Sequence, residues 1–143
     1  MSEPGSQHTA KTEAGRTLRV VIVDDHPAVH TSLRFALLSV EDIEVVGEAA
    51  DGEEALQVCG DLHPDVVLMD LRLPGRLSAG EAIRALQRPD RPVPRVLAHT
   101  VDYDARLVPE ALAAGACGYV LKGDLAELVA AIRAAHARPQ AKA

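Results

Sequence analysis

The stretch Leu18-Arg-Val-Val-Ile-Val-Asp24-Asp25-His26-Pro27 shows the pattern on which the whole chain is built, because a short apolar run ends abruptly in two carboxylates. Short runs rich in β-branched side chains are typical of strands buried in a parallel sheet. Pro27 suits the first turn of a helix. The stretch therefore predicts a buried strand, an acidic loop and a helix.

Apolar runs of this kind alternate along the chain with segments of helical periodicity. Further strands are expected at 43–46, 66–69, 95–98 and 118–121. Helices are expected from Pro27, over Glu53–Gly60, Ala79–Leu86 and Tyr103–Ala114, and from Leu125 onward, with Gly60 and Gly115 as stop signals. Five strands and five helices in strict alternation predict an α/β fold, a doubly wound parallel sheet with helices on both faces.

Length and composition predict one globular domain, since the chain has 143 residues, of which 48% are hydrophobic and 25% charged. We assign the domain to residues 18–137, with a disordered N-terminal tail at 1–17 and a short C-terminal tail at 138–143. The net charge of −6 argues against direct nucleic-acid binding, which needs clustered cations.

No apolar run is long enough to span a membrane, and the N-terminus lacks the apolar segment of a secretory signal. The two cysteines, Cys59 and Cys117, are far apart and are interpreted as small buried thiols in a reducing compartment. We therefore expect a soluble, cytoplasmic protein that does not bind membranes.

Polar residues follow four of the five predicted strands, at the sheet edge where ligands bind in open α/β folds. They are Asp24 and Asp25, Asp70, Thr100 and Lys122. Three neighbouring carboxylates repel one another and favour Mg²⁺, which keeps some of its waters for a phosphate. Asp70 is the candidate nucleophile toward phosphorus, because it lies at the centre of the sheet. Thr100 and Lys122, the one lysine between residues 19 and 137, supply a hydroxyl donor and a compact charge for the phosphoryl group.

Longer motifs surround these residues in a fixed order. They are Val-Ile-Val-Asp24-Asp25-His26-Pro27, Pro64-Asp-Val-Val-Leu-Met-Asp70-Leu-Arg-Leu-Pro74-Gly75, His99-Thr100, Ala114-Gly-Ala-Cys-Gly-Tyr119-Val-Leu-Lys122 and Leu128-Val-Ala-Ala-Ile132. From Arg19 to about Ala137 the chain thus resembles the receiver domain of bacterial two-component response regulators. The first and fourth motifs resemble the subfamily that usually carries a LuxR-type helix-turn-helix output domain.

The resemblance implies a flavodoxin-like five-stranded sheet of order 2-1-3-4-5 with five helices. It implies that Asp70 accepts a phosphoryl group from a sensor histidine kinase. It also implies that Asp25 ligates Mg²⁺ directly, that Asp24 acts mainly through metal-bound water, and that the backbone carbonyl of Arg72 is a third protein ligand.

The resemblance also implies a switch, in which Thr100 and Lys122 contact the phosphoryl group and the Tyr119 side chain swings inward. The expected output face comprises the helix at 103–114, the strand at 118–121 and the last helix, where another protein or a second copy would bind as a homodimer. The protein would then be no enzyme in the ordinary sense, but a phosphoacceptor that assists its own phosphorylation and dephosphorylation. It would act alone or as the N-terminal part of a longer DNA-binding transcription regulator.

Two departures from the family pattern stand out. The loop after Asp70 holds one or two extra residues, and Gly123 replaces the proline that often follows the lysine.

Other classes of protein fit the sequence less well. A Mg²⁺-dependent hydrolase of the haloacid-dehalogenase kind would need an acid at position 72, where Arg72 stands. A flavodoxin would not place carboxylates at a phosphate loop. A receiver-like interaction module that works without phosphorylation remains the alternative.

Histidines also occur in or beside these motifs. We interpret His26 and His30 as solvated or capping side chains, because no third metal ligand is evident beside them. We interpret His99 as structural, because it points to the opposite face of its strand from Thr100.

Overall fold

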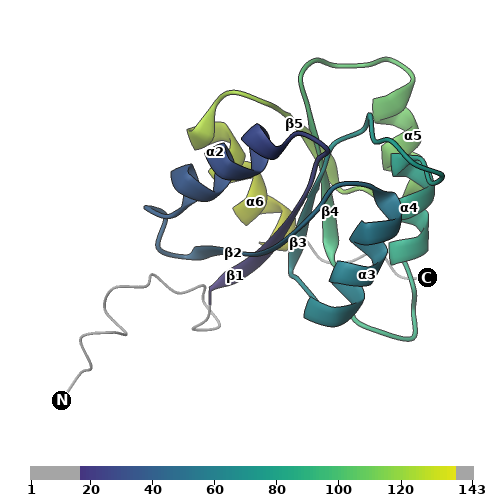
Figure 1. The fold of residues 1–143 in the computed structure, drawn as a ribbon, viewed down its shortest axis with the longest axis horizontal. Coiled ribbons are helices and arrows are strands. Elements are labelled where there is room, and N and C mark those ends of the chain that lie inside the picture. Colours follow the sequence, from purple (N-terminus) through teal and green to yellow (C-terminus); the bar gives the residue numbers. More distant parts are fainter. Residues whose placement is uncertain (1–16, 138–143) are drawn as a thin grey trace.

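The computed structural model describes residues 17–137, in which five strands form one parallel sheet of order β2-β1-β3-β4-β5 (Figure 1). The strands are β1 (Leu18–Val23), β2 (Ile43–Ala49), β3 (Val66–Met69), β4 (Arg95–Thr100) and β5 (Gly118–Leu121). The helices are α2 (Pro27–Leu37), α3 (Gly52–Leu62), α4 (Ala79–Leu86), α5 (Leu107–Ala114) and α6 (Leu125–Ala137). The predicted fold class and strand order are confirmed. The predicted tails fall outside the described residues, apart from Thr17.

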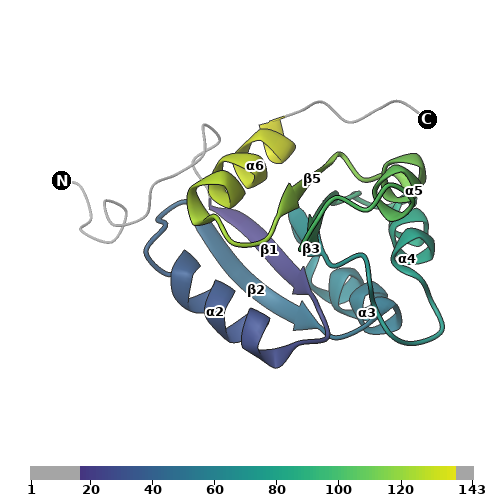
Figure 2. The ribbon, with the colours of Figure 1, turned by 90° about the horizontal axis from the view of Figure 1, so that it is seen from above.

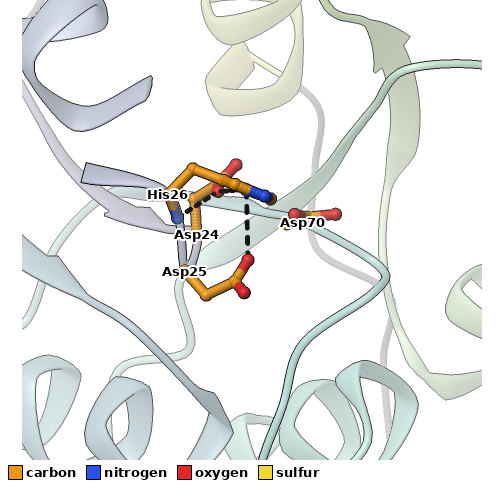
Figure 3. A group of neighbouring side chains, drawn as sticks. All are labelled: Asp24, Asp25, His26 and Asp70. Atoms are coloured by element: carbon orange, nitrogen blue, oxygen red, sulfur yellow. Dashed lines mark hydrogen bonds and ion pairs between the residues drawn. The ribbon is translucent and has the colours of Figure 1, made fainter. Parts of the chain in front are cut away.

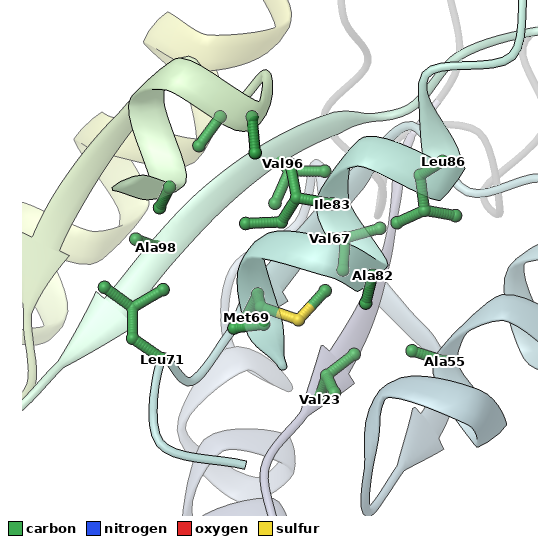
Figure 4. Close-up of a cluster of buried hydrophobic side chains, with 14 of the residues drawn as sticks. Val23, Ala55, Val67, Met69, Leu71, Ala82, Ile83, Leu86, Val96 and Ala98 are labelled. Carbon is green, nitrogen blue, oxygen red and sulfur yellow. The ribbon is translucent and has the colours of Figure 1, made fainter. Parts of the chain in front are cut away.

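Helices cover both faces of the sheet, with α2 and α6 on one face and α3, α4 and α5 on the other (Figure 2). Successive residues of β1 point to opposite faces, so Val20 and Ile22 pack with α2 and α6. Val21 and Val23 pack in the second cluster, beneath α3, α4 and α5 (Figure 4). Because both faces are covered, β1 is apolar at nearly every position, as its sequence predicts.

Strand register brings the carboxyl ends of the central strands to one edge. Val23 at the end of β1 lies opposite Met69 at the end of β3, which in turn lies opposite Ala98 in β4. Thr100 at the end of β4 pairs with Leu121 at the end of β5. The residues that follow these strands therefore meet at one edge of the sheet.

Two helices differ from their predicted bounds by more than one residue. Helix α3 continues through Gly60 to Leu62 and ends where His63 adopts a left-handed conformation, with φ of 50°. Helix α5 begins at Leu107 rather than Tyr103, because the carboxylate of Asp104 accepts hydrogen bonds from the backbone N–H groups of Arg106 and Leu107 at the helix start.

The helix after the long loop begins where the sequence predicted. Ser78 accepts a hydrogen bond from the backbone N–H of Glu81, and the Glu81 carboxylate accepts one from the backbone N–H of Ser78. This capping box fixes the start of α4 at Ala79. The long loop after Asp70 therefore leaves the start of α4 where the sequence predicts it.

Candidate functional site: a carboxylate cluster at the edge of the sheet

The ends of β1 and β3 bring three carboxylates together. One ligand atom from each of Asp24, Asp25 and Asp70, and one from His26, all lie within 4.8 Å of one another (Figure 3). The backbone N–H of Asp70 donates to the carbonyl of Val23 at 2.9 Å, which continues the pairing of the two strands into the cluster. Parallel pairing of β1 with β3 thus places the acidic side chains.

Lys122 brings a positive charge to this cluster. Its Nζ lies 2.8 Å from Oδ2 of Asp24 and 3.5 Å from Oδ2 of Asp70. The backbone N–H of Lys122 donates to the carbonyl of Thr100 at 2.7 Å, which holds the end of β5 against β4. Gly123 follows with φ of 119°, a conformation that glycine adopts without strain and proline cannot.

Asp24 is the most deeply placed acid of the cluster, with 1% of its surface exposed. Burial raises the pKa of this carboxyl, but hydrogen bonds from Lys122 and from His26 outweigh burial, so the pKa lies below its ordinary value. Asp24 is therefore held as a carboxylate, while Asp25 lies in contact with solvent.

His26 belongs to the cluster as well, although its sequence pattern predicted only a solvated or capping side chain. Its Nδ1 lies 2.9 Å from Asp24 and 3.2 Å from Asp25. These neighbours raise the pKa of His26, first through the hydrogen bond with Asp24 and then through the charges of Asp25 and Asp24. The adjacency of His26 to two acids at a strand end was the available signal. Its side chain is solvent-exposed but makes no helix-capping hydrogen bond.

The expectation of a solvated or capping His30 is wrong. His30 is buried, and its Nε2 lies 2.6 Å from the backbone carbonyl of Asp24. It therefore supports the loop that carries the acidic pair. His99 is buried as well, and burial and the charge of Lys122 lower its pKa to about 4. A neutral, buried side chain agrees with the structural interpretation of His99.

Thr100 is buried at the end of β4, where its hydroxyl donates to the backbone carbonyl of Asp102 at 2.9 Å. Arg72 links the same segment to the loop after β3, since its guanidinium lies 2.9 Å from Asp104 and 3.7 Å from Asp102. The backbone N–H of Arg72 donates to Asp70 at 3.1 Å. The two loops beside Asp70 are therefore tied to each other.

Tyr119 lies in β5 with 44% of its surface exposed. Its ring meets the ring of Tyr103 edge to face, with 5.3 Å between the ring centroids. Tyr103, which the helical spacing places in a helix, lies in the loop before α5. Its ring covers part of the Tyr119 ring. In this structure Tyr119 points outward.

Both cysteines are free thiols, as expected, but only one is fully buried. Burial raises the pKa of Cys59 to about 12, so this thiol stays protonated and unreactive. Cys117 is half-buried. Neither lies within the carboxylate cluster.

The donor set of the cluster fits a hard divalent cation. Carboxylate oxygens from Asp24, Asp25 and Asp70 lie close enough to share one ion, and oxygen ligands are those that Mg²⁺ and Ca²⁺ select. The two aspartates after β1 and the one after β3 come from different loops, so an ion between them would tie the loops together.

A parallel sheet of this order, with an acidic cluster and a lysine at its carboxyl edge, is the arrangement of one class of α/β domain. The family model for the response regulator receiver domain matches residues 20–133. The chain belongs to this family of two-component systems.

Curated relatives agree. The chain is 44% identical over 117 residues to the response regulator GacA of Pseudomonas viridiflava, covering 81% of this chain and 54% of the relative. It is 40% identical over 119 residues to the transcriptional regulatory protein LiaR of Bacillus subtilis, covering 82% of this chain and 56% of the relative. The chain thus spans about half the length of the curated relatives it matches.

Solved structures share the fold. A two-component response regulator of the LuxR family from Aurantimonas sp. SI85-9A1 superimposes with a TM-score of 0.77 at 39% identity, covering 88% of this chain and 89% of that one. The isolated receiver domain of RcsB from Salmonella enterica, determined with the phosphomimetic BeF3⁻, gives a TM-score of 0.73 at 28% identity, covering 83% and 88%. Within residues 17–137, no helix is long and apolar enough to cross a membrane.

Proposed function

We propose that this domain is a phosphorylation-activated receiver, which accepts a phosphoryl group from a sensor histidine kinase on Asp70. The observation that carries the proposal is the meeting of Asp24, Asp25 and Asp70 within 4.8 Å, with Lys122 at 3.5 Å from Asp70. A carboxylate nucleophile, a lysine and a ligand set for a cation are the parts that phosphoryl transfer to an acid requires.

Asp25 and Asp70, with the backbone carbonyl of Arg72, would hold Mg²⁺, and Asp24 would contact it through bound water. When bound, Mg²⁺ supplies positive charge that neutralises the oxygens of the transferring phosphoryl group. The oxygens of Asp25 and Asp70 fit this role because they lie in one group that reaches solvent through Asp25.

In the transfer step, a carboxylate oxygen of Asp70 forms a bond to phosphorus while the P–N bond of the donor phosphohistidine breaks. The electron pair of that bond returns to the imidazole nitrogen. Lys122 already contacts Asp70 and can form an ion pair with the oxygens of the phosphoryl group once it is attached. Thr100 would exchange its hydrogen bond to the Asp102 carbonyl for one to a phosphoryl oxygen.

This exchange is the proposed switch. Loss of the Thr100–Asp102 bond frees the segment that Arg72 holds, and Tyr119 leaves Tyr103 and turns inward. Shifting a two-state equilibrium from 1:99 to 99:1 takes about 5.5 kcal/mol. Two or three charge-assisted hydrogen bonds of roughly 1.5–3 kcal/mol each can supply this difference.

The output surface in this proposal comprises α5, β5 and α6. These elements and the loop before α5 carry exposed apolar side chains, namely Leu112, Tyr119, Leu121 and Leu125 on the elements and Tyr103 in the loop. Such side chains suit a protein partner or a second copy of the domain, forming a homodimer. Sedimentation and hydrogen exchange with and without beryllofluoride test this surface. We expect the activated protein to associate or to show altered protection of residues 100–122. If neither change is observed, the output surface lies elsewhere.

The phosphoacceptor itself is tested by intact mass after incubation with acetyl phosphate and Mg²⁺. The wild type should gain one phosphoryl group, and Asp70→Asn should gain none. Asp61→Asn, which alters an exposed acid on α3, is the matched control and should be labelled like the wild type. An unlabelled wild type would favour the alternative, an interaction module that works without phosphorylation.

A further inference from the structure

A cavity of about 520 Å³ lies between α3 and the connection from α4 to β4. Pro64 and Pro94, which line it, precede β3 and β4, whereas Asp70 and Thr100 stand at the other ends of these strands. The cavity is therefore at the opposite edge of the sheet from the carboxylate cluster. Its volume lies within the range of sites that bind small molecules.

The floor of the cavity is apolar. Leu86 and Cys59 are 8% and 5% exposed, and Leu56 is half-buried beside them. Several prolines complete the wall and restrict the backbone of the connection. The floor therefore suits an aliphatic or aromatic group.

The charge around this cavity is opposite to that of the chain as a whole. Arg84, Arg88 and Arg91 line it and no aspartate or glutamate does, although the chain carries a net charge of −6. Arg88 pairs with Asp90 at 2.8 Å. Within residues 17–137, Arg84 and Arg91 form no ion pair, although the charge of Arg91, after that of Arg88, also contributes to lowering the pKa of Asp90. The result is a local excess of positive charge.

The position of these arginines is only partly explained by the helix that carries them. Arg84 lies in the last turn of α4, where a cation interacts favourably with the helix dipole. Arg88 and Arg91 lie beyond that helix. Nη1 of Arg91 is 3.6 Å from the place that a Cβ on Gly60 would occupy, so this guanidinium extends across to α3 at the cavity.

We propose that this cavity binds a small organic anion, one with an apolar body and a carboxylate, sulfonate or phosphate group. The apolar body would occupy the floor formed by Leu56 and Leu86. The anionic group would meet the guanidinium groups of Arg84 and Arg91, whose planar donors suit such oxygens. This site goes beyond phosphorylation at Asp70 and does not depend on it.

The probe is 8-anilinonaphthalene-1-sulfonate, with uncharged N-phenyl-1-naphthylamine as the matched apolar probe. Fluorescence titration of the full chain should show saturable binding of the sulfonate at one site. In ¹⁵N NMR spectra, the sulfonate should shift amides of residues 56–63 and 84–91, which include the cavity lining. Shifts centred on another surface, or no saturation, would overturn the proposal.

The double variant Arg84→Gln/Arg91→Gln tests the role of charge. It should bind the sulfonate at least tenfold more weakly, while binding of the uncharged probe is unchanged. Arg106→Gln, which removes an exposed arginine from the start of α5, should bind both probes as the wild type does. Equal loss of binding of both probes, or unchanged binding of the sulfonate, would contradict the proposal. Displacement of the sulfonate by hexaglutamate would also contradict it, because it would indicate a site for acidic peptides. A native NMR spectrum of the double variant serves as the check on folding.

Discussion

The ammonium of Lys122 donates a 2.8 Å hydrogen bond to the carboxylate of Asp24, from 98 positions away in the sequence. The bond connects the ends of β5 and β1, which are separated in the sheet by β3 and β4. It therefore reaches across the place where Asp70 lies. In a group of three carboxylates, Lys122 therefore supplies a compensating positive charge.

Removing this charge should destabilise the fold. Lys122→Met leaves the buried Asp24 without its cation, which should lower the free energy of unfolding by about 1–3 kcal/mol in metal-free buffer. Urea denaturation measures the change. Asp24→Asn added to Lys122→Met should recover part of the loss, because the buried charge is then gone. Wild-type stability of Lys122→Met would show that the contact contributes nothing.

Removing the Asp25 carboxylate should have the opposite effect on stability in the absence of metal. Asp25→Ala takes one of three repelling carboxylates from the cluster, so its melting temperature without Mg²⁺ should equal or exceed that of the wild type. Calorimetric titration should show weaker Mg²⁺ binding, and labelling by acetyl phosphate should slow. Asp61→Ala, at an exposed position on α3, is the control. Unaltered Mg²⁺ affinity of Asp25→Ala would exclude it as a ligand.

The position of the site was accessible from the sequence, because parallel strands of similar length place their carboxyl ends at one edge. Asp24, Asp25, Asp70 and Lys122 follow such strands, and the structure brings all four together. The predicted ligand role of the Arg72 carbonyl and the switch roles of Thr100 and Tyr119 stay predictions. Strand periodicity locates a residue at the edge but does not fix the partner of its side chain.

The errors arose where local hydrogen bonds override a residue's usual preference. Helical spacing predicts a start at Tyr103, yet α5 begins four residues later, at Leu107, beside the hydrogen bonds to the Asp104 side chain. Glycine is a common stop signal, but helix α3 continues through Gly60 and ends only where His63 takes the left-handed position. Burial of His30 depends on the carbonyl of Asp24, which sequence spacing cannot reveal.

Stability should fall in mildly acidic solution because of His99. Burial, together with the charge of Lys122, lowers the pKa of His99 from 6.5 to about 4. Between these values the unfolded chain binds a proton that the folded chain excludes, so the free energy of unfolding falls as the pH drops from 6.5 towards 4. The loss due to His99 should be about 2 kcal/mol at pH 5.

Urea midpoints at pH 7.5 and pH 5.0 measure this effect. His99→Gln removes the titrating group, so the difference between its two midpoints should be smaller than for the wild type. His63→Gln, at an exposed histidine, should keep the wild-type difference. If His99→Gln and the wild type lose equal stability between the two pH values, His99 is not the source.

The contact of Tyr103 with Tyr119 gives an optical signal for the switch. They are the two tyrosines of a chain without tryptophan, so intrinsic fluorescence reports on this pair alone. Beryllofluoride with Mg²⁺ should change the fluorescence of the wild type, because Tyr119 leaves Tyr103, and should leave Asp70→Asn unchanged. Tyr119→Phe should abolish most of the response. A bound phosphomimetic with constant fluorescence would argue against movement of Tyr119.

The most direct test of phosphorylation at Asp70 is to locate the acyl phosphate chemically. Borohydride reduces an aspartyl phosphate to homoserine, and trypsin separates the candidates, since residues 20–34 hold Asp24 and Asp25 while residues 35–72 hold Asp70. After treatment with acetyl phosphate and Mg²⁺, mass spectrometry of the reduced, digested protein should find homoserine at position 70 only. Homoserine at position 24 or 25, or a phosphoryl group on a histidine with Asp70 unmodified, would contradict the assignment of Asp70 as the phosphoacceptor.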